Sequence, residues 1–241
     1  MYASLYDELY QRIPDHPQLS SKESPFGRHL ATAREFGRIK RFLKAHTVFL
    51  EVGPGDCALS FKAAGIVQQV YAIDVSAEIT RRASPPENFQ LVLSDGCTIP
   101  VPSGGIDVAY SNQLMEHLHP DDASQQLQNI FKALTHGGIY ICLTPNRLSG
   151  PHDISKYFDP IATGFHLKEY TTTDLSKLFR CTGFSRVGVL LGAGGAFMVL
   201  PVLPFSLLEG ILTRLPSPLQ RRISTILPVR WLLGVRLVGV K

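Results

Sequence analysis

The stretch Val48–Ser60, VFLEVGPGDCALS, decides the fold. Three apolar residues lead into Glu51 and the turn Gly53-Pro54-Gly55, and the residues that follow can start a helix. A buried strand, a tight glycine turn and a helix N-terminus in this order usually seat a nucleotide-like cofactor. Because Gly53 and Gly55 lack a Cβ atom, they let the backbone come close to a ligand.

Two cofactors fit the glycine spacing. The pattern G-x-G-x-x-G/A of dinucleotide-binding folds is matched by Gly53, Gly55 and Ala58. Asp74 follows at the distance of the ribose-binding acid of such folds. However, Pro54 has no N–H to offer a pyrophosphate, and Glu51 would repel phosphate but suit a cation. A ligand with a ribose, an adenine and an ammonium group but no phosphate fits better, and S-adenosylmethionine is such a ligand.

Several motifs in order carry a family resemblance. They are EVGPG at Glu51–Gly55, Asp74 in YAIDVS, Asp95-Gly96 after NFQLVLS, and IDVAYSNQLMEHL. Together they resemble a class I S-adenosylmethionine-dependent methyltransferase of the small-molecule, type 11 kind, over roughly residues 47–182. Cys57 departs from the pattern, since many members carry a third glycine there, and we expect slightly wider helix–strand spacing at this point.

The resemblance implies a set of cofactor contacts. Asp74 would accept from the ribose hydroxyls, Asp95 from the adenine amino group, and Glu51 would stabilise the ammonium group. Asp74 could instead cap the helix that follows it, and Asp95 could simply form a turn. The implied cofactor-binding positions are Glu51, Gly53, Pro54, Gly55, Asp74, Val75, Asp95, Gly96, Ser111 and Asn112.

Histidines are the candidates for the chemistry on the acceptor, because a hydroxyl acceptor usually needs a base near its oxygen. His117 follows the fourth strand in NQLMEHLHP, and His152 and His166 lie in the long loop after the fifth strand. Each could equally be a packing or surface histidine. His117 and His119 have no third ligand at zinc-like spacing, so we expect no metal.

Length and composition favour one large globular domain. The chain has 241 residues, of which 44% are apolar and 18% charged. No secretory signal opens the sequence, and the four cysteines are scattered, so we expect reduced thiols and a cytoplasmic location. The net charge is +4, but after Asp174 nine basic residues face a single acid, Glu209. Only the tail is basic, which does not indicate a nucleic-acid partner.

Alternating apolar and helical segments predict an α/β fold with a mostly parallel sheet and helices on both faces. Predicted strands are 48–53, 69–75, 89–94, 106–111, 139–144, 184–191 and a last one within 231–241; predicted helices are a short one within 1–26 and others over 27–45, 56–65, from 76, 121–134 and 173–183. The resemblance implies a Rossmann-like seven-stranded sheet in the order 3-2-1-4-5-7-6 with strand seven antiparallel. We expect a helical cap (1–46) and a methyltransferase domain (47–241).

The insertion 192–230 between strands six and seven is apolar and basic. Val187–Leu208 carries no formal charge and is long enough to cross a bilayer, but its glycines and prolines argue against a span. A proline-bounded helical cap over the acceptor cleft is the expected structure. The alternative is a cap that also lies on a membrane, since the apolar pair Leu207-Leu208 precedes Arg214 and Arg221-Arg222.

These observations predict S-adenosylmethionine-dependent O-methylation of a small, lipid-linked or sugar-linked acceptor. The sequence around Thr144-Pro145-Asn146 is not the N/D-P-P-Y/F signature of methyltransferases that act on exocyclic or amide nitrogens. Two alternatives stay open at this point: an NAD(P)-dependent oxidoreductase of the Rossmann type, and a non-catalytic subunit that binds the cofactor.

Overall fold

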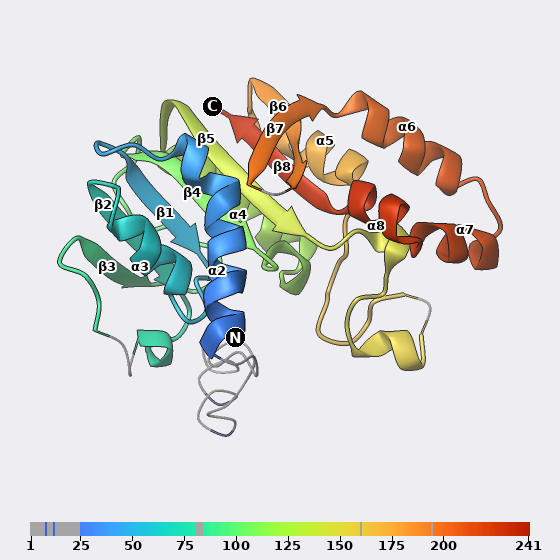
Figure 1. Ribbon diagram of the computed structural model, residues 1–241, viewed down its shortest axis with the longest axis horizontal. Coiled ribbons are helices and arrows are strands. Elements are labelled where there is room, and N and C mark those ends of the chain that lie inside the picture. Colours follow the sequence, from blue (N-terminus) through green and yellow to red (C-terminus); the bar gives the residue numbers. More distant parts are fainter. Residues whose placement is uncertain (1–7, 9–11, 13–24, 81–83, 160, 194) are drawn as a thin grey trace.

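A single eight-stranded sheet runs through the described part of the computed structural model, which comprises residues 8, 12, 25–80, 84–159, 161–193 and 195–241 (Figure 1). The strands are β1 Val48–Val52, β2 Gln69–Asp74, β3 Phe89–Leu93, β4 Ile106–Asn112, β5 Leu134–Thr144, β6 Arg186–Ala193, β7 Ala196–Pro201 and β8 Val235–Val240. Their order is β3-β2-β1-β4-β5-β8-β6-β7. The pairs among β1 to β5 are parallel, while β8 runs antiparallel to both β5 and β6.

This topology confirms the expected fold class, and it adds one strand at the edge. The expected strand seven is β8, antiparallel as predicted, but it begins at Val235 rather than at Trp231. The segment 196–201, expected within a helical cap, instead forms β7, which pairs antiparallel with β6 in a hairpin. The sheet therefore has eight strands, not seven.

Helices cover both faces of the sheet. The α-helices are α2 Pro25–Ile39, α3 Ala58–Ala64, α4 Pro120–Ala133, α5 Thr172–Thr182, α6 Leu203–Leu212, α7 Ser217–Ser224 and α8 Leu227–Leu233. The 3₁₀ helices are η1 Lys40–Phe42, η2 Ala77–Thr80, η3 Met115–His117, η4 Arg147–Ser149 and η5 Ile154–Tyr157. The predicted helix within 1–26 falls on residues of which only 8, 12, 25 and 26 are described.

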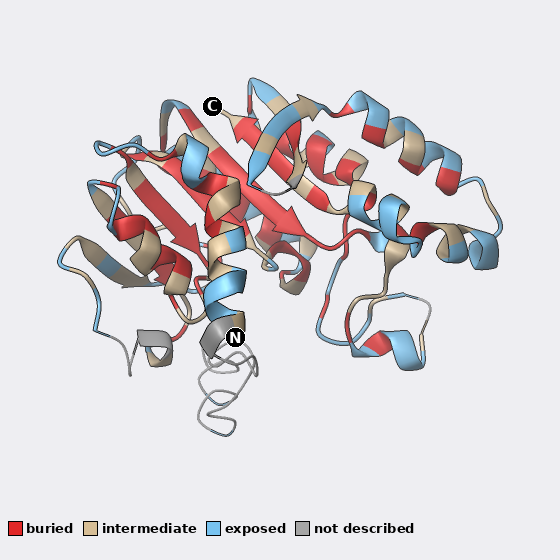
Figure 2. Ribbon diagram, in the orientation of Figure 1, coloured by how far each residue is buried: buried red, intermediate tan, exposed pale blue. Residues whose placement is uncertain are grey.

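Two apolar cores follow from the alternation of side chains along the strands. On one face, α2 and α3 pack against alternate strand residues such as Phe49 and Val108. On the other face, α4 and α5 pack against their neighbours, Leu50 and Ala109. The burial of the central strands on both faces (Figure 2) explains why they read as continuous apolar runs. The division into a cap (1–46) and a domain (47–241) stays a prediction, and α2 packs in the same core as α3.

The predicted boundaries mostly hold to within two residues, and β5 is the main exception. It begins at Leu134, directly after α4, where a loop through His136-Gly137-Gly138 was expected to stop the helix. The helix predicted to start at Asp56 is α3, which begins at Ala58. Asp56 Oδ1 accepts a hydrogen bond from the Ala58 N–H at 3.0 Å. The strand predicted at 184–191 is β6, which begins later, at Arg186. Gly183, at φ 118°, and the residues after it form the turn out of α5.

The helices α6 to α8, which follow β7, extend the molecule beyond the sheet (Figure 1). They dock through a small apolar cluster of Leu148, Leu212 and Leu233. None of the helices in the described part of the chain has the length and apolarity that a membrane span requires.

Candidate functional site

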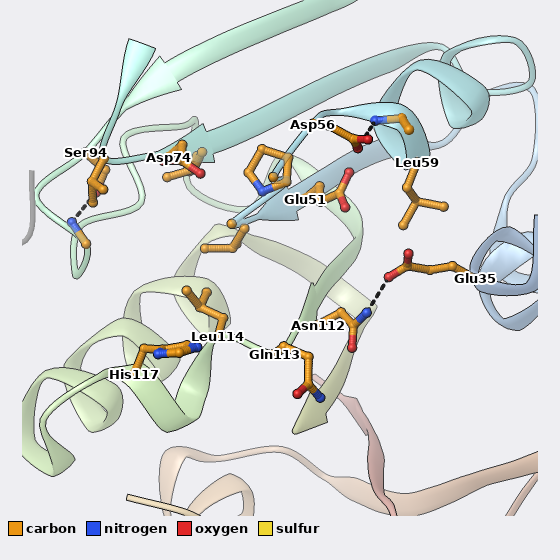
Figure 3. A pocket seen from close by; sticks show the side chains of 18 of the residues that line it. Glu35, Glu51, Asp56, Leu59, Asp74, Ser94, Asn112, Gln113, Leu114 and His117 are labelled. Atoms are coloured by element: carbon orange, nitrogen blue, oxygen red, sulfur yellow. Dashed lines mark hydrogen bonds between the residues drawn. The ribbon is translucent and has the colours of Figure 1, made fainter. Parts of the chain in front are cut away.

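A cavity of about 350 Å³ opens where β1, β2 and β4 end, with α2 forming one of its walls. This is the edge at which ligands bind in open α/β sheets. Figure 3 shows the carboxylates of Glu35, Glu51 and Asp74 around it, with Asn112 and His117 beyond. The predicted residues that line it are Glu51, Gly53, Pro54, Gly55, Asp74, Val75, Gly96, Asn112 and His117.

The turn after β1 favours glycine at two positions. Gly53 adopts φ 71° and Gly55 φ 56°, both in the left-handed region. A Cβ atom on Gly53 would also lie 3.2 Å from Leu114 Cδ1. The Gly53 N–H donates to the Ile73 carbonyl at 2.9 Å and so ties the turn to β2. The backbone therefore comes close to the cavity, as the sequence predicts.

Glu51 is a buried carboxyl group at the cavity wall. Ser60 Oγ donates to Glu51 Oε2 at 2.5 Å. Burial raises the pKa of Glu51 well above its usual range, because the charged form loses its hydration. A ligand cation in the cavity would favour the charged form, so this position suits an ammonium group and not a phosphate.

Asp74 ends β2 and lines the cavity. Its Oδ1 atom accepts from the Ser76 N–H at 3.1 Å, which is the capping interaction considered as an alternative. The two roles are compatible, because a carboxylate has a second oxygen and further lone pairs. Ribose binding by Asp74 stays a prediction that its position supports.

Two predicted residues do not reach the cavity. Asp95 is exposed, and its Oδ1 accepts from the N–H groups of Thr98 at 2.7 Å and Cys97 at 2.8 Å, bonds that lower the pKa of Asp95. It forms a turn that leaves its neighbour Gly96 at the cavity wall. The Ser111 hydroxyl is fully buried, 2.7 Å from the hydroxyl of Tyr140, so its side chain points away from the ligand space.

Sequence reasoning missed Glu35 of α2. Its Oε1 atom accepts from Asn112 Nδ2 at 2.7 Å and from the Tyr110 hydroxyl at 2.6 Å. These bonds attach the helix to the end of β4 and place a second carboxylate on the cavity (Figure 3). A signal was present, since Glu35 is the only acid in the otherwise basic segment 27–45.

The three candidate histidines fall in two places. His117 lines the cavity, while His152 and His166 lie behind it and share the buried carboxylate of Glu169. Nδ1 of His166 is 2.7 Å from Glu169 Oε1, and Nδ1 of His152 is 3.2 Å from Oε2. Burial acts against the charge on Glu169, but hydrogen bonds from His152 and His166 outweigh it and lower the pKa of Glu169 to about 2.

Glu116, which sequence reasoning also missed, is fully buried beside His117. Its Oε2 accepts from Thr144 Oγ1 at 2.8 Å, and burial raises its pKa to about 7. Burial lowers the pKa of His117, whose Nδ1 lies 3.1 Å from the carbonyl oxygen of Phe165. A carboxylate oxygen of Glu116 and one ring nitrogen each of His117 and His166 all lie within 4.8 Å of one another. His119, by contrast, is exposed and caps α4, and it does not belong to this group.

Comparisons with known proteins agree with this geometry. Residues 50–142 match the family model of a methyltransferase domain. A probable S-adenosylmethionine-dependent methyltransferase of Mycolicibacterium smegmatis is 32% identical over 99 residues, which cover 40% of this chain. The aligned stretch spans 36% of that relative's length.

Solved structures show the same fold at low sequence identity. A methyltransferase solved in complex with the Trm112 methyltransferase activator of Haloferax volcanii superposes with a TM-score of 0.61 at 16% identity, over 99% of this chain and 95% of that one. An S-adenosylmethionine-dependent methyltransferase of Archaeoglobus fulgidus gives 0.58 at 19% identity, with all of both chains covered. Phosphoethanolamine N-methyltransferase 1 of Haemonchus contortus, bound to phosphoethanolamine and S-adenosylhomocysteine, gives 0.58 at 13% identity over 81% of this chain and 42% of that one.

The alternative of a dinucleotide oxidoreductase is not favoured by any of these matches. The sheet order and the family match agree: residues 50–142 of this chain match a methyltransferase domain, and the whole chain has the fold of solved S-adenosylmethionine-dependent methyltransferases.

Proposed function

We propose that this protein transfers the methyl group of S-adenosylmethionine to a hydroxyl group of a small, amphipathic acceptor. The observation that carries the proposal is the cavity at the ends of β1, β2 and β4, where Glu51 and Asp74 flank a turn that contains Pro54. The turn lacks one of the N–H donors a pyrophosphate would need, while the carboxylates suit an ammonium group and ribose hydroxyls.

Methyl transfer from a sulfonium ion is an in-line displacement. The acceptor oxygen forms a bond to the methyl carbon, the sulfur–carbon bond breaks, and its electron pair stays on sulfur. The hydroxyl proton leaves to a nearby base or to water. Because the leaving group is already activated, the protein mainly has to align the two reactants and exclude water.

His117 marks the side of the cavity where the acceptor would lie. It stands on η3, after β4, and is the one candidate histidine of the three that lines the cavity. Nearby, the Asn112 amide is held by Glu35. The acceptor hydroxyl would therefore meet His117, and the roles of His152 and His166 would be to hold the loop behind it through Glu169.

Turnover tests this assignment. With a methyl-accepting substrate found by screening hydroxylated amphipathic compounds, His117→Ala should lower turnover at least about 100-fold, as loss of a positioned group at the reacting atom does. Its affinity for S-adenosylhomocysteine should stay within a few-fold of wild type. His119→Ala, two residues away but exposed, is the matched control and should change neither quantity. Unchanged turnover in His117→Ala would remove this residue from the reaction, and cofactor binding without any turnover would indicate a silent relative.

The outer face of α6 suggests where such an acceptor is met. Leu203, Leu207 and Ile211 stand four residues apart on one side of the helix and are 65%, 59% and 62% exposed. On the inner side Glu209, the one acid after Asp174, is only 3% exposed. The helix therefore has apolar side chains on both sides, and its one acidic residue is buried beside Phe205 and Leu212, whereas an ordinary surface helix turns polar residues outwards.

The charges of the same segment complete the pattern. Arg214, Arg222 and Arg230 are exposed, and Glu209, the single acid after Asp174 in the sequence, is buried. We propose that α6–α8 rest on an anionic lipid surface and that the acceptor is lipid-linked or membrane-dissolved. Flotation with vesicles that contain anionic lipid should carry the protein upwards, whereas neutral vesicles should not. A protein that stays in the soluble fraction with both would refute this, and concentration-dependent dimerisation instead would assign the face to a second copy.

A further inference from the structure

Three side chains that can bind a metal, from two distant segments, meet at the wall of the cavity. Glu116 and His117 belong to η3, and His166 comes from the loop between β5 and α5. The loop is fastened there by its backbone, since the N–H groups of Leu167 and Lys168 donate to the Glu116 carbonyl at 2.7 and 3.2 Å. The three side chains are therefore held together by structure around them and not by their own contacts alone.

The Glu116 carboxyl group is incompletely satisfied. Oε2 accepts from Thr144, but Oε1 has no hydrogen-bond partner within the described part of the chain, and the whole side chain is buried. A buried carboxylate oxygen without a partner is costly, and buried charges are normally paired or bound to metal. One carboxylate oxygen of Glu116 lies within 4.8 Å of a ring nitrogen of His117 and of His166, whose ring centroids are 4.9 Å apart in an edge-to-face arrangement.

Both rings are oriented from their far side. Nδ1 of His117 faces the Phe165 carbonyl oxygen at 3.1 Å, and Nδ1 of His166 faces Glu169 Oε1 at 2.7 Å. These partners can only accept, so each Nδ1 carries the hydrogen and each Nε2 of a neutral ring presents its lone pair. Histidines that bind metals are almost always held in this way by a carboxylate or a backbone carbonyl.

We propose that Glu116, His117 and His166 bind a divalent transition-metal ion, for which Zn²⁺ is the best match. Two imidazoles and one carboxylate are a donor set of catalytic zinc sites, which keep one position open. The charges of Glu116 and Glu169 would balance that of the ion. Because His117 also lines the cavity, the ion would lie at its wall, where its open position could polarise an acceptor hydroxyl. This last role rests on the proposed methyl transfer; binding of the ion does not. In the loaded protein His117 is a ligand and takes no proton itself.

Metal titration of the full, tag-free chain tests the site. After removal of metal with a chelator, Zn²⁺ is added in competition with a chromophoric chelator, and Co²⁺ is added separately as a spectroscopic probe. One equivalent should bind, with the strong visible absorption of four-coordinate cobalt. Glu116→Gln and His166→Ala should each lose at least about 100-fold in Zn²⁺ affinity. Glu169→Gln keeps all three proposed ligands but alters the hydrogen bonds to His166 and His152, and it should lose about 10- to 100-fold.

Two variants serve as controls for other zinc-seeking groups. His136→Ala removes an exposed histidine on β5, and Cys181→Ser removes the exposed thiol; both should bind Zn²⁺ like the wild type. The proposal would be overturned if the wild type bound well under one equivalent of Zn²⁺. It would also be overturned if Glu116→Gln and His166→Ala bound Zn²⁺ as tightly as the wild type does. The cobalt spectrum of the unmutated protein gives this answer even if a variant fails to fold. Zinc binding without S-adenosylhomocysteine binding would refute only the proposed function, and the converse only the metal site.

Discussion

In the half of the molecule that contains β1 to β4, carboxylates stand at the open edge of the sheet and face a cavity. In the segment from β7 to α8, the one acidic side chain is buried and the apolar side chains of α6 face outwards. The first half holds most of the stretch that matches the methyltransferase domain, residues 50–142, and the second lies outside that match. Both regions contribute strands to one sheet, yet the acidic side chains of the first face a cavity and the one acidic side chain of the second is buried.

This difference indicates different kinds of ligand. Parallel strands bring their carboxyl ends to one edge, so Glu51 and Asp74, on neighbouring strands, both line one cavity, which suits a small charged molecule. The outward apolar side chains of α6 do not converge on one point, and they suit an extended surface. The placement of the acids therefore separates the region that binds the cofactor from the region that we propose meets the lipid.

The largest effect is expected at Glu209, the one acidic residue of the segment from β7 to α8. Glu209 accepts from the N–H groups of Thr172 and Thr173 at 2.7 and 2.9 Å and from Asn146 Nδ2 at 2.8 Å. Glu209→Ala leaves these buried donors without a partner, which should lower the free energy of unfolding by about 3–5 kcal/mol. Urea denaturation measures this, with exposed Glu87→Ala as the control. A loss below about 1 kcal/mol would mean that Glu209 does not anchor α6.

In the cofactor region, Asp74 should dominate ligand affinity. Asp74→Ala removes charge-assisted hydrogen bonds to the ribose, worth about 2–3 kcal/mol, so S-adenosylhomocysteine should bind roughly 30- to 150-fold more weakly. Calorimetry checks the value against Glu87→Ala, which precedes β3 at the opposite edge of the sheet and should bind normally. If affinity is unchanged, Asp74 serves only to cap the turn through Ser76.

The proposed lipid contact can be weakened by charge alone. Replacing Arg214 and Arg222 together by glutamine should cost about 1 kcal/mol per residue, or roughly 30-fold in affinity for anionic vesicles. The same replacement of Lys40 and Lys44, exposed residues in and just after η1, removes equal charge from the other region. If both double variants lose the same affinity, binding depends on net charge and the face of α6–α8 has no special part in it.

The smallest expected effect concerns the pH dependence of cofactor binding. The pKa of Glu51 lies well above its usual 4.5 because the group is buried, and a bound ammonium group would lower it again. Binding should therefore release protons, and affinity should rise with pH in the range above 4.5 where the free protein still holds the proton. Glu51→Gln should bind about 10-fold more weakly and lose this dependence. Titrations in buffers of different ionisation enthalpy measure the proton release, and its persistence in Glu51→Gln would assign it to another group.

The sequence predicted the cofactor half well, because its signals are local. An apolar run, a glycine turn and an acid at a strand end lie within a few residues of each other, so β1, β2 and the turn hold to within one residue. β7 was missed because AFMVLP is a short apolar run between a glycine and a proline, for which periodicity cannot tell a strand from part of a buried helix. The early start of β5 was missed because Gly137 and Gly138 read as a loop.

The site behind the cavity could not be predicted for a different reason. Glu116, His166 and Glu169 come together only because the loop after β5 folds back onto η3. No spacing in the sequence carries that information, since the two segments are separated by α4 and β5. Glu35 likewise reaches Asn112 through the packing of α2 on the sheet. Local sequence patterns predicted the strand ends that line the cavity, whereas tertiary contacts decide which other side chains lie beside them.

Calorimetric titration of the wild-type protein with S-adenosylhomocysteine, and separately with NADH, tests the assignment of the cofactor. S-adenosylhomocysteine should bind at one site per chain, with an affinity that Asp74→Ala weakens, and NADH should give no measurable heat of binding. Binding of NADH, weakened by Asp74→Ala and with no binding of S-adenosylhomocysteine, would contradict this assignment.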